Sequence, residues 1–218
     1  MVKEFIMDLV DALNFINKHG IPTARYWVVS KLGDLDKVKA DLTFPLVVKI
    51  SSREVVHKSD LGGVVTDIRT YDELKRTIKM LEERFSHVSD KKWLLQEMVR
   101  GDIELIAGGL RDEVFGPVVM FGLGGVFTEV YGDVTFRLTP LTIDDAYNMI
   151  SSIKARVLLD GYRGIPPINK EKIVSILLKV SEIMSSYEEI KEIDINPIIC
   201  KGDMVKAVDA RIVLSKGY

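Results

Sequence analysis

A long polar segment, residues 51–61, separates two short apolar runs of this chain. The run before it carries a single lysine, Lys49, and the run after it begins at Gly62-Gly63. The pattern predicts a strand, a long loop and a second strand, and long structureless loops inside compact domains are often functional. The segment holds hydroxyls, an arginine, a lysine and a histidine beside glycines, a mixture that suits a polyphosphate. An ordinary solvated hairpin loop is the alternative interpretation.

The rest of the chain mixes helical and strand patterns without strict alternation. Helical spacing of apolar residues predicts helices over 3–18, 70–85 and 169–187, the second of them with a capping box at its start. Strands are predicted at 26–29, 45–50, 63–68, 93–98, 103–106, 114–121, 192–200 and 204–208. Residues 108–112 are interpreted as the turn between the fifth and sixth of these. Frequent hairpins favour α+β lobes with largely antiparallel sheets over a doubly wound parallel sheet.

Composition excludes several classes of function. The 218 residues suffice for one large domain or two small lobes. A net charge of −2 and the lack of a basic-aromatic cluster argue against nucleic acid as a partner. The apolar runs are too short to span a bilayer, and early acidic residues interrupt any secretory signal, so we expect a cytoplasmic protein. One cysteine, Cys200, and three histidines leave oxygen ligands, and hence Mg²⁺, as the natural choice for any bound metal.

A glycine-rich stretch at 122–125 superficially matches a dinucleotide-binding fingerprint. The third glycine is missing at the required place, and residues 126–131 have a strand pattern where a helix is needed. We therefore reject a Rossmann interpretation. A loop over an active cleft and a purely structural turn both remain open.

Several polar residues lie where a nucleotide could be bound. Lys49 sits in an apolar strand, where it either reaches the solvent edge or faces a polar cleft, and the polar loop after it favours phosphate. The strand end 96–99 could offer backbone groups to an adenine edge, and Glu104 could accept hydrogen bonds from a ribose. An ordinary strand with surface acids is the alternative.

A second polar group lies near the C-terminal end of the sequence. Asp194 and Asn196 alternate with apolar residues, so they are predicted on one face of a strand, with Asp209 across a hairpin on the next strand. Oxygen ligands on adjacent strands, completed by phosphates and water, would suit Mg²⁺. A polar solvent face explains the same pattern.

His57 lies in the polar loop, and a core position or a metal-ligand role suits it poorly, because the loop is not packed and offers no partner ligands. Its ordinary pKa of about 6.5 leaves a neutral imidazole at neutral pH. Beside bound phosphates such an imidazole could take up a phosphoryl group and carry it elsewhere.

Taken in order, these motifs resemble the ATP-grasp family, and within it the β subunits of ADP-forming acyl-CoA (acetyl-CoA) synthetases. The motifs that carry the resemblance are His57–Val64, Gln96–Val99, Gly122–Val126, Asp194–Pro197 and Val208–Arg211. The resemblance implies an ATP-grasp domain over 1–218, with an N-terminal helix at 3–18. Two α+β lobes, at about 20–97 and about 98–218, would enclose a nucleotide cleft.

The resemblance also implies the roles of individual residues. His57 would relay a phosphoryl group to ADP, and Asp194 would stabilise the phosphohistidine by accepting an imidazole N–H. Asn196 and Asp209 would bind Mg²⁺. The residues assigned to ATP or ADP are Val48, Lys49, Ser51, Arg53, Glu97, Val99 and Glu104.

No segment of the chain resembles a CoA-binding domain. The chain as a whole therefore resembles half of an enzyme. The resemblance implies a partner α subunit that binds CoA and carries the acyl-phosphate chemistry, in an α2β2 complex. Two alternatives are a self-contained carboxylate–amine ligase, which would not need His57, and a non-catalytic nucleotide-binding regulatory module.

Overall fold

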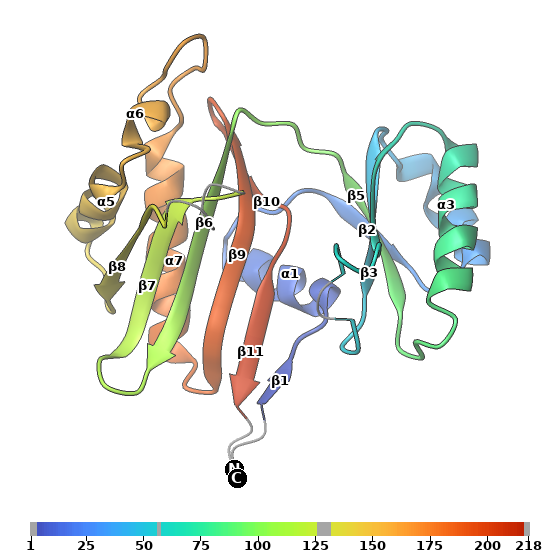
Figure 1. Cartoon of the computed structure of the whole chain (residues 1–218), viewed down its shortest axis with the longest axis horizontal. Coiled ribbons are helices and arrows are strands. Elements are labelled where there is room, and N and C mark those ends of the chain that lie inside the picture. Colours follow the sequence, from blue (N-terminus) through green and yellow to red (C-terminus); the bar gives the residue numbers. More distant parts are fainter. Residues whose placement is uncertain (1–3, 56–57, 126–131, 216–218) are drawn as a thin grey trace. The chain divides into compact units, whose positions relative to one another are not determined.

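The computed structural model describes residues 4–55, 58–125 and 132–215, and it divides into two compact units (Figure 1). The small unit comprises residues 8–11 and 24–98, and the large unit comprises residues 1–7, 12–23 and 99–218 as far as they are described. Each unit has a sheet of its own. Every pairing between neighbouring strands of the two sheets is antiparallel, which confirms the predicted α+β class.

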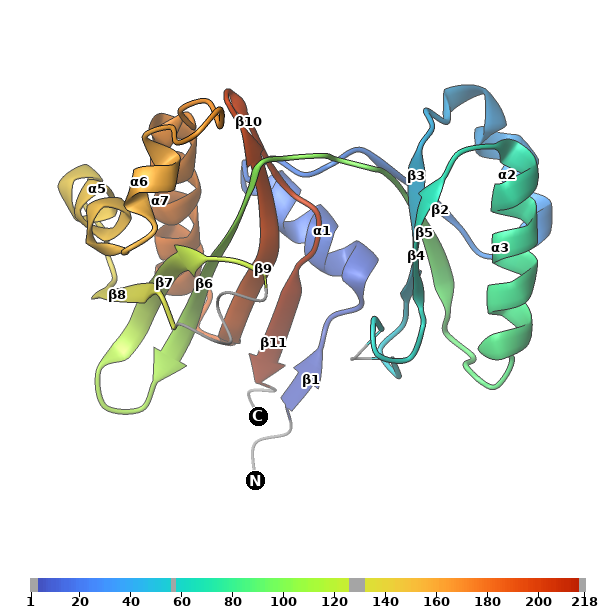
Figure 2. The ribbon, with the colours of Figure 1, turned by 45° about the horizontal axis from the view of Figure 1, so that its top comes forward.

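The small unit is a four-stranded sheet, counted over its described residues, in the order β2-β5-β3-β4, with helix α3 on one face (Figure 2). Thr70 and Glu73 form the predicted capping box at the start of α3, and Leu74, Ile78 and Leu81 of this helix enter the core. The elements of the unit are β2 (Tyr26–Val29), η1 (Leu32–Asp34), α2 (Leu35–Val38), η2 (Lys39–Asp41), β3 (Leu46–Ser51), β4 (Val64–Ile68), α3 (Tyr71–Arg84) and β5 (Lys92–Glu97).

The large unit is built on a sheet of seven described strands in the order β1-β11-β9-β6-β7-β8, with β10 paired to β9. Helices α5, α6 and α7 lie on one side of this sheet (Figures 1 and 2). Its strands are β1 (Glu4–Ile6), β6 (Ile103–Asp112), β7 (Gly116–Leu123), β8 (Val134–Leu138), β9 (Ile190–Lys201), β10 (Met204–Ala207) and β11 (Arg211–Ser215). Its helices are α5 (Ile143–Ser152), α6 (Arg156–Leu159) and α7 (Lys170–Ser186), while α1 (Leu9–Lys18) has residues in both units.

The N-terminal helix begins later than the sequence pattern predicts. Residues 4–6 form strand β1, which pairs with β11 from Glu4 opposite Ser215. The Asp8 carboxylate accepts the amide N–H of Asp11 at 2.9 Å and so caps the first turn of α1. The predicted helix over 3–18 is therefore wrong for its first residues, because pairing with a distant strand overrides the local apolar spacing.

The hairpin after residue 103 also differs from the prediction, because the pair Gly108-Gly109 lies inside β6 and not in a turn. A Cβ on Gly108 would lie 2.5 Å from the Ile193 carbonyl oxygen, and one on Gly109 would lie 2.4 Å from Met184 Cγ. Close packing in the sheet therefore requires these glycines. The real turn follows Asp112, whose side chain accepts the amide N–H groups of residues 114 and 115. The predicted strand at 126–131 lies outside the described residues.

Two further features bear on chemistry. Cys200 is fully buried in β9, and burial raises the pKa of its thiol to about 12. Among the helices in the part of the chain that the structure describes, none is long and apolar enough to cross a membrane.

Candidate functional site

In the small unit, Lys49 is a buried cation in the middle of strand β3. Its register places it opposite Leu94 of β5 and Val64 of β4, and it is only 6% exposed. Neighbouring residues of a strand point to opposite faces, and Val48 packs into the core beneath α3. Lys49 therefore lies on the sheet face opposite α3. The side chain of Val48 is part of the hydrophobic core.

The Ser51 hydroxyl is engaged with the start of helix α1. It accepts the Val10 N–H at 3.0 Å and donates to the Asp8 carboxylate at 3.0 Å, and Lys92 lies 3.2 Å from the same carboxylate. Burial raises the pKa of Asp8, but hydrogen bonds from the Asp11 amide, Lys92 and Ser51 outweigh burial and place this pKa below its ordinary value. The hydroxyl of Ser51 thus already has a donor and an acceptor, and its contact with a nucleotide stays a prediction.

The polar segment after β3 is fixed at its start by hydrogen bonds. Ser52 donates from its hydroxyl to Asp90, which also accepts the Arg53 N–H at 3.0 Å. Ser89 donates to the Glu54 carboxylate at 3.0 Å. Arg53 itself is exposed. His57 lies outside the described residues.

The strand end predicted to meet an adenine is held by two backbone bonds. Glu97 donates its N–H to the Arg25 carbonyl at 2.9 Å, and its carboxylate accepts the Arg25 N–H at 3.0 Å. Met98 donates to the Pro45 carbonyl at 3.0 Å. Glu97 belongs to the small unit, whereas Val99 begins the long stretch that belongs to the large unit.

In the large unit, Glu104 lies beside the glycine-rich stretch. Gly124 donates its N–H to the Glu104 carbonyl at 2.7 Å, and Gly125 has a φ of +69°. A Cβ on Gly125 would lie 3.0 Å from Oε2 of Glu104, and one on Gly124 would lie 3.0 Å from the Leu105 carbonyl carbon. The two glycines therefore let this stretch pass directly over the backbone and carboxylate of Glu104.

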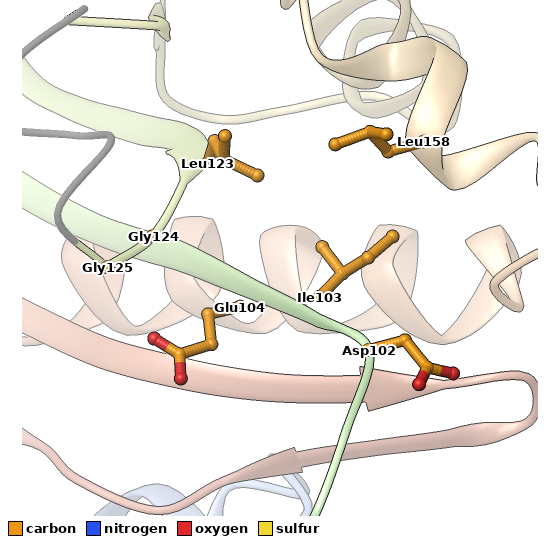
Figure 3. Close-up of a pocket in the computed structure, with 7 residues that line it drawn as sticks. All are labelled: Asp102, Ile103, Glu104, Leu123, Gly124, Gly125 and Leu158. Atoms are coloured by element: carbon orange, nitrogen blue, oxygen red, sulfur yellow. The ribbon is translucent and has the colours of Figure 1, made fainter. Parts of the chain in front are cut away.

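A pocket of about 300 Å³ adjoins this region (Figure 3). The side chains of Ile103, Leu123 and Leu158 surround its space, whereas the carboxylates of Asp102 and Glu104 point away from it. Its lining residues are Asp102, Ile103, Glu104, Leu123, Gly124, Gly125 and Leu158. Glu104 therefore borders an apolar recess, whereas its carboxylate is directed away from that recess.

The predicted metal ligands gather around β9. Asp194 lies opposite Arg211 of β11, and Val208 donates its N–H to the Pro197 carbonyl at 3.1 Å. These two links bracket Asp209, which therefore lies next to the stretch 194–197. Asp209 is in the connection between β10 and β11, and not on a strand as the sequence pattern predicted.

Asn196 is exposed, at the irregularity where the pairing of β9 with β6 shifts register. The described residues hold no group of three or more His, Cys, Asp or Glu side chains that could bind a metal. Carboxylate and amide oxygens at 196 and 209 nevertheless have the ligand chemistry that Mg²⁺ prefers.

Sequence reasoning missed two side chains that organise these positions. Asp8 binds Ser51, and Asp90 binds Ser52 and the amide of Arg53. An acid just before an apolar helical stripe is a capping signal, which could have identified Asp8 as the first residue before α1. Nothing local marks Asp90, because its partners lie 37 and 38 residues away in the sequence.

Comparison with known proteins identifies the class. Residues 3–214 match the model of an ATP-grasp domain, so the chain belongs to the ATP-grasp family. It is 40% identical over 209 residues to the β subunit of ADP-forming acetate–CoA ligase I of Pyrococcus furiosus, a match that covers 94% of this chain and 90% of that subunit. Within the family it therefore groups with the β subunits of ADP-forming acetate–CoA ligases, as the motifs predicted.

Solved structures agree with this assignment. A chain of acetyl-coenzyme A synthetase 1 of Candidatus Korarchaeum cryptofilum, in complex with coenzyme A, Ca-AMPCP and HgCl⁺, matches with a TM-score of 0.90 and 40% identity, over 96% of this chain and 93% of that chain. The same enzyme with coenzyme A and Mg-AMPPCP, its phosphohistidine segment pointing towards the nucleotide binding site, matches with a TM-score of 0.83 and 41% identity, over 94% and 91% of the two chains. The predicted ATP-grasp fold is thereby confirmed.

Proposed function

We propose that this chain is the ATP- and ADP-binding subunit of an ADP-forming acyl-CoA synthetase of the acetate–CoA ligase type. The observation that carries the proposal is the full-length similarity to a β subunit of such a ligase. The Korarchaeum structure adds that a relative binds Mg-AMPPCP and has a phosphohistidine segment directed at its nucleotide site. In the proposed reaction, the P–N bond of phosphohistidine 57 breaks as a P–O bond forms on the terminal phosphate of ADP. The reverse transfer is equally allowed.

We assign the nucleotide contacts by the chemistry of the residues. Lys49, a buried cation on the face of β3 opposite α3, is assigned to the phosphates, together with Ser51 and Arg53. The backbone of 97–99 and of Val48 is assigned to the base, and the Glu104 carboxylate to the ribose hydroxyls. Transfer of a phosphoryl group depends mainly on positioning and charge neutralisation, which such a set can provide.

Asn196 and Asp209 would hold Mg²⁺, and Asp194 would orient the imidazole. The two oxygen donors lie in neighbouring stretches of the large unit, as the link from Val208 to Pro197 indicates. A bound Mg²⁺ would neutralise charge on the nucleotide phosphates. Asp194 would accept the imidazole N–H of His57 and so favour the ring orientation that exposes the other nitrogen to phosphorus.

A partner subunit would supply the CoA chemistry. Relatives carry the name "subunit beta", which implies an α partner in those enzymes. We propose an α2β2 complex in the cytoplasm, with the acyl-phosphate step in the α subunit.

Labelling with ATP tests the proposed relay. The chain is incubated with γ-³²P-ATP and Mg²⁺, and an acid-labile, base-stable label is expected on the protein. His57→Ala should lose the label, whereas His87→Ala, at an exposed histidine next to the end of α3, should keep it. Undiminished acyl-CoA synthesis by a complex carrying His57→Ala would overturn the relay and favour a ligase that does not use this histidine.

A further inference from the structure

The segment that contains His57 is fixed at its start by the turn before β5. Asp90 in this turn uses both carboxylate oxygens: Oδ1 accepts the Ser52 hydroxyl and Oδ2 accepts the Arg53 N–H at 3.0 Å. The Ser52 hydroxyl in turn accepts the Glu54 N–H at 3.0 Å. Val55 then enters the hydrophobic core at 7% exposure. Each of the residues 52–55 is therefore fixed by a hydrogen bond or by burial in the core.

The end of the same segment is fixed separately by helix α3. Arg84, at the last turn of α3, donates from Nη1 to the Gly62 carbonyl at 3.1 Å. Gly63 donates its N–H to the Lys58 carbonyl at 2.6 Å, and the Gly63 carbonyl accepts the Ile50 N–H at 2.8 Å. A Cβ on Gly63 would lie 2.5 Å from the Ile50 side chain. The glycine pair thus forms a tightly packed turn on β3.

We propose that Asp90 is a positioning residue for phosphoryl transfer, which fixes the start of the segment so that His57 meets the nucleotide phosphate in a productive geometry. Arg84 provides the matching constraint at the end of the segment. The inference rests on the relay proposed above and adds the residues that set the reach of His57.

The physical reason lies in the geometry that transfer demands. Attack on phosphorus requires the nitrogen in line with the bond that breaks, and a misplacement of about 1 Å can cost roughly a hundredfold in rate. Without the Asp90 bonds, the start of the segment would be held only by the Ser89–Glu54 hydrogen bond and by the burial of Val55, which is a looser attachment. The carboxylate of Asp90 accepts hydrogen bonds from both the Ser52 hydroxyl and the Arg53 N–H. An amide at this position has one acceptor oxygen and one N–H group, so one of the two bonds must be lost or reversed in direction.

Two substitutions and their combination test the role of Asp90. In the 218-residue chain, Asp90→Asn and Ser52→Ala are compared in the single-turnover rate of labelling from γ-³²P-ATP, in ADP affinity by calorimetry, and in melting temperature. If Asp90 acts through Ser52, the double variant should be hardly slower than Asp90→Asn alone. The control is Asp112→Asn, because Asp112 also accepts two hydrogen bonds in a turn, in this case from two amide N–H groups in the hairpin between β6 and β7.

We expect Asp90→Asn to slow formation of the phosphohistidine by roughly tenfold or more, with ADP affinity and melting temperature close to those of Asp112→Asn. A rate equal to that of the parent chain overturns the inference. So does a fall in rate that is matched by equal losses in ADP affinity and melting temperature, which marks a merely structural role. A parent chain without any His57-dependent label overturns the proposed relay, and this inference with it.

Discussion

Arg111 donates a hydrogen bond from Nη2 to the main-chain oxygen of Met184 at 2.7 Å and thereby caps the C-terminal end of helix α7. The same nitrogen donates to the Tyr187 carbonyl at 3.1 Å, and Nε lies 3.3 Å from the Ile190 carbonyl oxygen. One side chain of β6 thus binds the last turn of the helix, the connection after it and the first residue of β9. A cation at this end also complements the helix dipole.

Replacement of Arg111 by methionine should destabilise the large unit. Three carbonyl groups would lose a charged donor, and we expect the free energy of unfolding to fall by about 2 kcal/mol in urea titrations. Arg137→Met is the control, because the exposed Arg137 guanidinium donates to the neighbouring Phe136 carbonyl on an edge strand, and a change within about 0.5 kcal/mol is expected there. Equal losses in the two variants would contradict the bridging role of Arg111.

Gly63→Ala should destabilise the small unit. The added methyl group would lie 2.5 Å from Ile50 Cγ2 and 3.0 Å from the Lys58 carbonyl oxygen, so the turn or the strand must shift. We expect a loss of about 1–3 kcal/mol in unfolding free energy. Gly33→Ala is the matched control, since nothing lies within 4 Å of its added Cβ, and its stability should change by no more than about 0.5 kcal/mol. A parent-like Gly63→Ala would show that the turn is loosely packed.

The contribution of Asp8 to stability should depend on pH. Its pKa is lowered in the folded state from the ordinary value of 3.8, so its carboxylate stabilises the fold above that value, and this stabilisation is lost as the pH falls through the folded pKa. Asp8→Asn should therefore cost about 1–3 kcal/mol at pH 7 and progressively less below pH 3.8. Chemical unfolding at a series of pH values measures the difference, with the exposed Asp41→Asn as the control. A difference that does not vary with pH would argue against the charged network.

Glu104→Gln should weaken nucleotide binding. The substitution keeps the shape beside Gly124 and Gly125 but removes the charge that, in the proposed site, would accept the ribose hydroxyls. The Kd for ADP should therefore rise by about tenfold in calorimetry. Glu113→Gln, in the exposed turn between β6 and β7, should leave the Kd unchanged. Parent-like affinity in Glu104→Gln would remove Glu104 from the proposed site.

Local sequence patterns predicted much of this molecule, because the features concerned depend on neighbours in the chain. The capping box at Thr70 and Glu73 and the apolar stripe of α3 are of this kind. The pair Gly108-Gly109 was interpreted as a turn, whereas contacts with Met184 and Ile193 place it inside a strand. No local signal carries that information.

The candidate site shows the same contrast between features that depend on neighbouring residues and features that depend on distant ones. Short motifs predict the residue types suited to phosphate and Mg²⁺, because each motif depends on neighbours in the chain. Such motifs could not reveal that Ser51 is bound to Asp8, or that Asp90 holds Ser52, because these partners are separated by 43 and 38 residues. The supporting side chains around a site come from the packing of distant segments, and only the folded chain brings them together.

The state of Cys200 has a practical consequence. This thiol is the only one in the sequence, and its pKa of about 12 keeps it protonated and unreactive near neutral pH. A fluorophore or spin label carrying a maleimide would therefore react with a cysteine introduced on the surface and leave the native one untouched. Distance measurements between two such labels could follow the chain through its catalytic cycle without first removing a core residue.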